Sequence, residues 1–330
     1  MALDRGALAP RVFADALAHE LLRSVASRSG VGADGASNDA TARGELAALA
    51  VMRVYHSAAG RAEYIGEQVS QLEHAAQAAH FALEEPGTPE AVVLGALLHD
   101  VGHLLPGLPQ MAGDLGVRRH EEYGAEFLRA LGLHRDSCAV VRGHVQAKRY
   151  LCWRTPAYHA QLSPASRGTL AQQGGPMTEA EATAFEADPL FTAIVKMRTW
   201  DEKAKVVHPD FVPRPVHAWT DALARSAARQ IARDQYEREG YVLLKRLLSP
   251  EMKRKVVDWC TEMESWEPRA GHMWHYYELI EGREELCRIE NFLPFHDQLR
   301  EFLTTGELAE MLREAMGGAA VRGFRGGPLS

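Results

Sequence analysis

The sequence predicts a mainly α-helical protein that ends in a smaller α+β segment, and three observations support this. Apolar residues recur at helical spacing from residue 45 to about residue 205 with little interruption. Three prolines between residues 206 and 232 then break the pattern, and a short strand-like run follows among helical stretches. With 330 residues and 46% hydrophobic content, the chain can bury one large core or two ordinary ones.

The expected domain limits follow from the same pattern. Residues 1–44 are expected to form an N-terminal extension, a short helix followed by a Gly-, Ala- and Ser-rich connection. A helical domain is expected over 45–205 and a linker over 206–232. The second segment then covers 233–330 and carries its strand at Tyr241 to Leu244.

Composition limits the partners and the compartment. The net charge of −7, with acidic and basic residues interspersed, provides no basic surface for nucleic acid. The four cysteines form no CxxC pair and no secretory signal precedes them, which favours free thiols and a cytoplasmic protein. No apolar run reaches the roughly 18 residues of a membrane span, so no membrane partner is expected. The oligomeric state is left open.

The stretch "LLHDVGH" carries the first candidate site. His99 and His103 are four residues apart, and Asp100 lies close to them on the same face of the expected helix. A single histidine at such a place is more often a partly exposed helix-end residue. An adjacent His-Asp pair favours a metal ligand instead, and it suits Fe, Mn or Zn.

Further N and O donors occur on other expected helices. They are His74, His120, His144 and Asp201. Together with His99 and Asp100 they make six donors with no cysteine, which indicates a hard to borderline metal and more than one ion.

Basic side chains accompany these donors. Lys148, Arg198 and His103 each lie three or four residues from a proposed ligand, and therefore on the same helix face. In a chain of negative net charge, this favours a pocket for a phosphonate or a phosphate, whose oxygens accept charge-assisted hydrogen bonds. The alternative is that Lys148 and Arg198 only neutralise nearby carboxylates.

The order H…HD…H…H…D resembles the HD-domain superfamily in its di-metal form. The stretches "YIGEQVSQLEH", "ALLHDVGH", "HEEYGAEFLRALG", "GHVQAKRYL", "LSPASRGTLAQQGGPM" and "WDEKAK" are similar to one branch, the mixed-valent di-iron oxygenases that cleave organophosphonates. The resemblance covers roughly residues 60 to 206 and implies an HD-domain helical bundle.

That resemblance also implies a ligand set, with two iron ions as an Fe(II)/Fe(III) pair and O2 as co-substrate. It assigns one iron to His74, His99, Asp100 and Asp201, and the other to Asp100, His120 and His144, so that Asp100 bridges the two.

Tyr64 and Glu67 resemble the substrate gate of the same family. The resemblance implies that the tyrosine occupies the second iron until substrate binds, and that Glu67 meets an ammonium group of the substrate. Ser166 would be a further phosphonate contact. Without the resemblance, Tyr64 reads as a core aromatic, Glu67 as a solvated helix charge and Ser166 as an ordinary hydroxyl. His80 points away from the face of His74 and is expected to be structural.

The activity implied is oxidative cleavage of the C–P bond of a 1-hydroxy-2-aminoethylphosphonate. The products would be phosphate and glycine, or glycine betaine from the trimethylammonium analogue. Two alternatives stay open: a metal-dependent HD-domain phosphohydrolase, and a binding module without catalysis.

Residues 233–330 resemble the beginning of a phytanoyl-CoA dioxygenase-like, 2-oxoglutarate-dependent oxygenase, through "YEREGYVLLKRLLSPEMKRKVVDWC". The resemblance implies a partial α+β segment, an incomplete jelly roll. That family binds iron through an H-x-D/E pair, and none occurs after residue 230. The segment is therefore expected to be catalytically empty, with His272, His275 and His296 at the surface.

Overall fold

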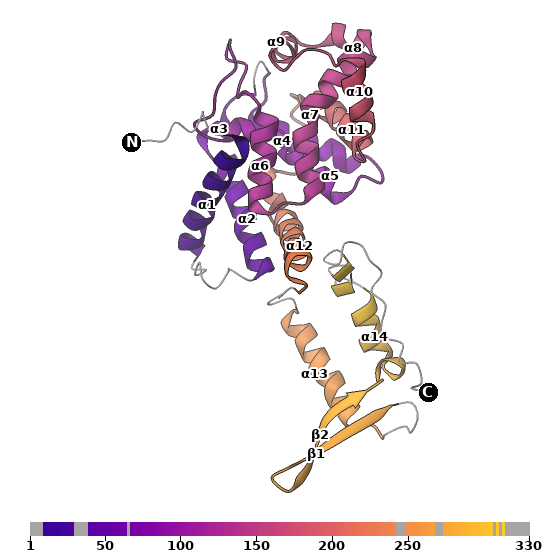
Figure 1. Ribbon diagram of the computed structural model, residues 1–330. Helices are drawn as coiled ribbons and strands as arrows, with labels where there is room; N and C mark the ends of the chain where they lie inside the picture. Colours follow the sequence, from indigo (N-terminus) through magenta and orange to yellow (C-terminus); the bar gives the residue numbers. More distant parts are fainter. Residues whose placement is uncertain are drawn as a thin grey trace. The chain divides into compact units, whose positions relative to one another are not determined.

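The computed structural model describes residues 9–29, 39–64, 67–241, 248–267 and 273–305, together with 308–309 and 312–313 (Figure 1). The chain divides into two compact units, Met1–Ile231 and Ala232–Ser330. The described residues are mostly helical, with one two-stranded sheet. The predicted fold class, mainly α with an α+β segment, is confirmed.

The helices of the first unit begin and end as follows. They are α1 (Pro10–Ser29), α2 (Ala40–Tyr55), α3 (Ala58–Arg61), α4 (Gln71–Glu84), α5 (Glu90–Leu98), α6 (His120–Leu131), α7 (Arg135–Arg154), α8 (Pro156–Gln161), α9 (Pro164–Gln172), α10 (Glu179–Glu186) and α11 (Phe191–Lys203), with α12 (Thr220–Glu239) starting in this unit.

The core of the first unit lies among α4, α5, α6, α7 and α11 (Figure 1). The α5 sequence "EAVVLGALL" is apolar all round and is buried from Val92 to Leu98, as expected of a helix covered on every side. This central helix ends where the site begins, because His99 and Asp100 follow directly after it.

The helix expected to carry His99, Asp100 and His103 is interrupted. The α-helix stops at Leu98, and His103 lies on a separate 3₁₀ turn, Val101–Leu104. The expectation of one continuous helical face is therefore wrong here, although the residues still meet. Gly102 lies in this turn against the start of α6, where a Cβ would overlap the carbonyl of His120.

The N-terminal segment packs into the first unit. Helix α1 lies against α6, where the Phe13 ring meets Tyr123 edge-on at 5.4 Å between centroids. Helix α2 begins at Ala40, inside the predicted extension, and α12 buries Leu223 and Ile231. The predicted limits at residues 44 and 205 therefore do not coincide with an edge of this unit.

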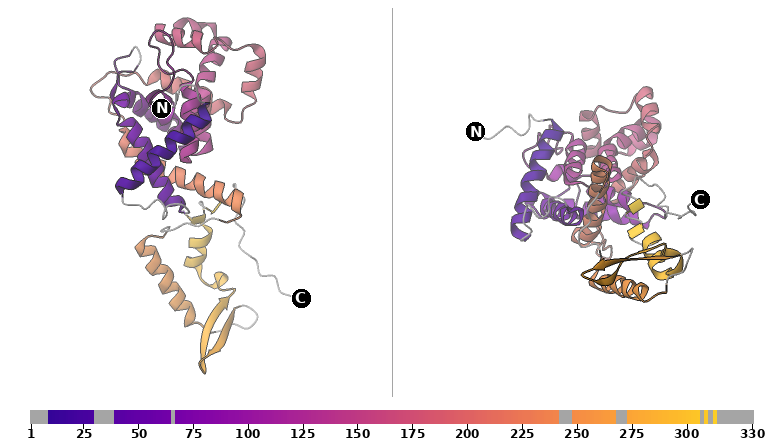
Figure 2. Two further views of the ribbon diagram at one scale, coloured as in Figure 1. Left: turned by 60° about the vertical axis from the view of Figure 1, so that its left-hand side comes forward. Right: turned by 60° about the horizontal axis from the view of Figure 1, so that its bottom comes forward.

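The second unit contains α13 (Pro250–Glu264), a hairpin of β1 (Trp274–Ile280) with β2 (Arg283–Glu290), and α14 (Asp297–Thr304). The strands pair antiparallel, and α13 lies alongside the hairpin (Figure 2). Glu281 and Gly282 both have positive φ, as a tight two-residue hairpin turn with right-handed strand twist requires. The expected strand at 241–244 lies, apart from Tyr241, outside the described residues.

The three histidines expected at the surface of this unit differ. His296 is buried, and its Nδ1 accepts a hydrogen bond from the Leu299 backbone N–H at 3.1 Å, so it caps α14 and the expectation is wrong. His275 is half-buried, and His272 lies outside the described residues.

All four cysteines are free thiols, as expected. Among the helices that the structure describes, none combines the length and the apolar character needed to cross a membrane.

Candidate functional site

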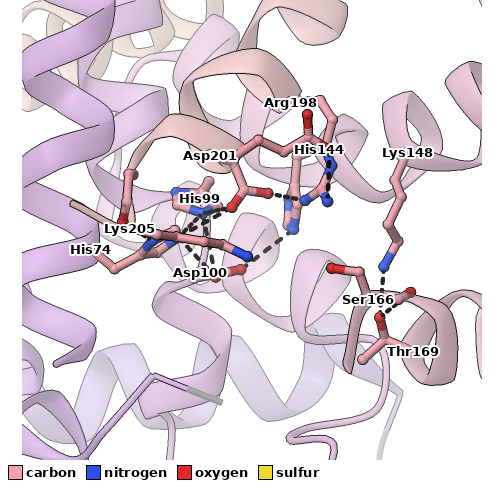
Figure 3. Close-up of polar contacts among 12 residues, drawn as sticks. His74, His99, Asp100, His144, Lys148, Ser166, Thr169, Arg198, Asp201 and Lys205 are labelled. Atoms are coloured by element: carbon pink, nitrogen blue, oxygen red, sulfur yellow. Dashed lines mark hydrogen bonds and ion pairs between the residues drawn. The ribbon is translucent and has the colours of Figure 1, made fainter. Parts of the chain in front are cut away.

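The six predicted metal ligands converge on one buried point of the first unit (Figure 3). They come from α4 (His74), the end of α5 (His99 and Asp100), the start of α6 (His120), α7 (His144) and α11 (Asp201). The four imidazoles form two pairs: the Nε2 atoms of His74 and His99 are 3.1 Å apart, and those of His120 and His144 are 3.0 Å apart.

Each of these imidazoles is oriented by the backbone. Its Nδ1 faces a carbonyl oxygen, at 2.8 Å for His74 and His99, 2.7 Å for His144 and 3.3 Å for His120. A carbonyl oxygen can only accept, so Nδ1 carries the proton and Nε2 directs a lone pair into the cluster. This is how a protein presents histidines to a metal ion.

Asp100 lies between the two histidine pairs. Its Oδ2 is 3.3 Å from His99 Nε2 and 3.7 Å from His74 Nε2. Its Oδ1 is 3.4 Å from the Nε2 atoms of both His120 and His144. One carboxylate oxygen thus serves each pair, which is the arrangement of a bridging ligand.

Asp201 completes the side of His74 and His99. Its Oδ1 is 3.3 Å from His74 Nε2 and is buried without a hydrogen-bond partner among the described residues, whereas Oδ2 accepts from the Arg198 guanidinium. Burial raises the pKa of the Asp201 carboxyl, but Arg198 and the histidines outweigh it and hold that pKa well below its usual range. An ionised, unpaired oxygen therefore faces the cluster.

The donor set fits a pair of metal ions. Two groups of side chains lie close enough to hold an ion each: His74, His99 and Asp100, and Asp100, His120 and His144. Two nitrogens that bind one metal at right angles, each about 2.1 Å from it, lie about 3 Å apart, which matches both imidazole pairs. Burial lowers the pKa of His99, yet Asp100 and Asp201 raise it to about 9; the carboxylates that favour a proton on Nε2 would equally favour a metal cation in its place.

The predicted gate residues lie at the rim of this cluster. The Tyr64 ring stacks on His74, with centroids 3.8 Å apart and 17° between planes. Burial and the carboxylates of Asp201 and Asp100 raise the pKa of Tyr64 well above its usual value, so the phenol is neutral. The Glu67 carboxylate accepts from Lys205 Nζ at 2.6 Å, which the sequence did not indicate.

A cavity of about 60 Å³ opens beside the ligands. All predicted gate and substrate residues line it: Tyr64, Glu67, His103, Lys148, Ser166 and Arg198. Sequence reasoning missed Thr169, Gln173 and Lys205, which line it as well. Thr169 and Gln173 follow Ser166 at helical spacing, and Lys205 is four residues after Asp201, so the rule that selected Lys148 could have found them.

The predicted basic residues differ in how they are held. Lys148 Nζ donates to Thr169 Oγ1 at 2.9 Å, and burial, with Arg198 nearby, lowers the pKa of its ammonium to about 8. Arg198 pairs with Asp201 and donates from Nε to Tyr158 at 2.8 Å. The alternative of carboxylate neutralisation thus describes two interactions of Arg198, with Asp201 and with Glu202, whereas the hydrogen bond of Lys148 goes to a hydroxyl.

His103 lines the cavity with its ring held in one tautomer. Its Nδ1 accepts from the Val117 backbone N–H at 3.0 Å, so the proton of the neutral ring is on Nε2. The ring stacks on His120 at 3.9 Å, and burial together with His120 holds the pKa of His103 well below its usual range. His80, expected to be structural, packs against Phe81 and Phe211.

Residues 69–190 match the HD domain family. The chain is 43% identical over 147 residues to the glycine-betaine-forming 1-hydroxy-2-(trimethylamino)ethylphosphonate dioxygenase of Leisingera caerulea, which covers 44% of this chain and 74% of the relative. It is 40% identical over 145 residues to hydroxymethylphosphonate dioxygenase of Gimesia maris, covering 43% of this chain and 71% of the relative.

A shorter similarity is to the 2-aminoethylphosphonate dioxygenase of an uncultured bacterium, 33% identical over 94 residues, or 28% of this chain and 36% of the relative. The longer matches span most of two phosphonate dioxygenases, and the HD match contains all the clustered ligands except Asp201. The chain therefore belongs to the HD-domain phosphonate oxygenases.

Proposed function

We propose that this protein is a di-iron oxygenase that uses O2 to cleave the C–P bond of a 1-hydroxy-2-aminoethylphosphonate. The products are phosphate and glycine, or glycine betaine from the trimethylammonium analogue. The atoms balance with one O2 for each substrate consumed, since glycine and phosphoric acid together contain the substrate atoms and both atoms of O2.

The observation that carries this proposal is the position of Asp100. One of its oxygens faces the His74 and His99 pair and the other faces the His120 and His144 pair. Two ions sharing a carboxylate can exchange charge and hold adjacent ligands, which suits an oxidation better than a single Lewis-acid site does.

The residues that would hold the irons are His74, His99, Asp100 and Asp201 for one ion, and Asp100, His120 and His144 for the other. Bound there as an Fe(II)/Fe(III) pair, the irons would supply the redox chemistry and the site for O2. Six N and O ligands without a thiolate suit iron.

The chain's own residues bind and orient the substrate. Lys148 and the Nε2–H of His103 supply donors for phosphonate oxygens, and Arg198 adds positive charge at the cavity wall. Holding the phosphonate at this wall keeps C1 beside the ligand cluster, so that the reacting atoms are oriented before the reaction starts.

Glu67, which pairs with Lys205, is the carboxylate that would meet a substrate ammonium, and Tyr64 covers the His74 side of the cluster. A neutral phenol held over the ligands can exclude water until a substrate takes its place. Tyr64 and Glu67 are separated by only two residues, so one segment carries both functions.

The test is O2-dependent release of phosphate. Iron-loaded protein with ascorbate is offered 2-amino-1-hydroxyethylphosphonate and, separately, its trimethylammonium analogue, and phosphate is followed by phosphorus NMR. We expect phosphate with an equal amount of glycine or glycine betaine, only when O2 is present. Phosphate released without O2 from simple phosphate esters, and none from either phosphonate, would instead establish a phosphohydrolase.

A further inference from the structure

Lys205 occupies the place on Glu67 that a cationic substrate needs. Its Nζ donates to Glu67 Oε1 at 2.6 Å, and it lies 5.8 Å from the centroid of the Tyr64 ring. A carboxylate and an aromatic face are the two groups that recognise an ammonium or a quaternary ammonium ion. The lysine head group therefore makes both contacts by which this end of the cavity would bind the nitrogen of a substrate.

The pair is part of the cavity. Both residues line the cavity beside the ligands, and their side chains are 22% and 23% exposed. Lys205 directly follows Ala204, whose carbonyl accepts from His74 Nδ1, so the main chain fixes it next to the ligand cluster (Figure 3). The ion pair of Lys205 and Glu67 is partly shielded from solvent, unlike a solvated surface pair. Replacing Lys205 by another cation as the partner of Glu67 therefore has a measurable free-energy cost.

A second cavity provides room for the lysine to leave. This cavity, of about 330 Å³, shares Glu67, Arg198 and Lys205 with the first and adds Tyr158 and Glu202. Glu202 is a carboxylate three residues before Lys205 in the chain. Glu202 Oε1 pairs with Arg198 Nη2 at 3.2 Å, so a displaced Lys205 ammonium would share this carboxylate with the guanidinium.

We infer that Lys205 is a specificity-determining residue: it pairs with Glu67 as an internal cation, so that a substrate with a cationic group binds only by displacing it, whereas a hydroxyphosphonate without an amine binds with the pair intact. This inference rests on the proposed function. It adds the residue that distinguishes phosphonates with a cationic group from phosphonates without one. The wild-type site then accepts phosphonates that have no amine. A cationic group on the phosphonate increases its affinity by less than it would if Glu67 had no lysine partner.

The test is a double-mutant cycle in binding. Dissociation constants of 2-aminoethylphosphonate and ethylphosphonate, which lack the C1 hydroxyl, are measured by calorimetry on iron-loaded protein without O2. Lys205→Met is expected to tighten 2-aminoethylphosphonate about tenfold, the change expected for one charge-assisted hydrogen bond, and to leave ethylphosphonate within about twofold. In the Glu67→Gln background the same substitution is expected to lose this selective effect.

Lys203→Met is the matched control, because Lys203 is the exposed last residue of α11, two residues before Lys205, and does not line either cavity. Equal changes for both ligands, or no change for either, would overturn the inference and leave the proposed function standing. If the iron-loaded wild-type protein releases no phosphate with O2 from either 1-hydroxyphosphonate, the proposed function fails and the inference fails with it. In Lys205→Met, the ratio of kcat/KM for the amino 1-hydroxyphosphonate to kcat/KM for the unsubstituted one is expected to rise.

Discussion

Asp100 is the residue on which both histidine pairs depend, because each of its oxygens faces a different pair. An asparagine keeps the shape but offers one acceptor oxygen and one NH2 group, so it cannot serve both sides. We expect Asp100→Asn to lower the iron content from two ions per chain to one or none. Phosphate release is expected to fall by at least about a hundredfold. Iron is measured by mass spectrometry of the purified protein.

The control for this variant is Asp210→Asn, whose side chain is 90% exposed and lines neither cavity. It is expected to keep both iron and activity. Full iron content in Asp100→Asn would contradict the bridging assignment, whatever the activity.

Lys148 gives the site a predicted pH dependence. Burial lowers the pKa of its ammonium to about 8, so its positive charge is complete well below pH 8 and is lost as the pH rises through that value. We expect kcat/KM for the phosphonate to decrease above about pH 8, since the uncharged amine holds the anion less well. A pH profile between 6.5 and 9.5, ~0.5 unit apart, measures this.

Lys148→Arg separates this cause from others, because a guanidinium stays charged throughout that range. The decrease near pH 8 is expected to disappear in Lys148→Arg, even if the overall rate is lower. An unchanged profile in this variant would assign the decrease to another group.

The residues of the ligand cluster could be predicted from the sequence, whereas the hydrogen-bond and ion-pair partners of the residues around it could not. The six donors and Lys148 follow from chemistry and spacing, with the resemblance to fix their grouping. The pairing of Glu67 with Lys205 joins positions 138 residues apart, and no local pattern links them. The packing of α11 against α4 brings together the segments that precede α4 and follow α11, in which Glu67 and Lys205 lie.

At the scale of elements, the 3₁₀ turn Val101–Leu104 determines how closely His103 and His120 can approach. Gly102 lies against the carbonyl of His120, where a methyl group has no room. We expect Gly102→Ala to destabilise the protein by about 1–3 kcal/mol, the range for overpacking, and to reduce its iron content. Thermal unfolding and metal analysis measure the two effects.

Gly87→Ala is the matched substitution, because Gly87 has φ +80° but open space around it. It is expected to cost about 1 kcal/mol through backbone strain alone and to keep its iron. Equal iron loss in both variants would mean that the contact at Gly102 has no special influence on the ligands.

The end of the helix at Leu98 is the main structural feature that the sequence did not predict. "LLHDVGHLL" has helical spacing and no proline, so local propensity favours continuation. What ends the helix is tertiary: the Asp100 carboxylate faces three imidazoles from other elements, and Gly102 packs against the start of α6. Such tertiary contacts outweigh the local helix propensity, and the sequence pattern of apolar and polar residues does not indicate them.

For the whole molecule, all the proposed ligands and substrate residues lie in the first unit. A chain that ends after Gly240 is therefore expected to keep two irons and to release phosphate with kcat/KM within about twofold of the full chain. It retains α12, whose Ile231 packs beside Gly132 at the end of α6. Phosphorus NMR and metal analysis of the two chains provide the comparison.

Removing α12 as well is expected to have a different result, because this helix buries Leu223, Ala227 and Ile231 in the first unit. A chain that ends at Pro215 is expected to unfold at a lower temperature. Loss of activity in the chain that ends at Gly240 would mean that the second unit contributes to catalysis.

The four imidazoles owe their orientation to main-chain carbonyls of Ala96, Val117, Val141 and Ala204. No substitution of a side chain can remove a carbonyl, so the ligand tautomers are insulated from most point mutations. The cavity wall, by contrast, consists of side chains that can change one at a time. Proteins with this scaffold can therefore acquire specificity for new phosphonates without changes to the metal ligands. A library of variants with substitutions only in the cavity wall is expected to retain metal in most of its members.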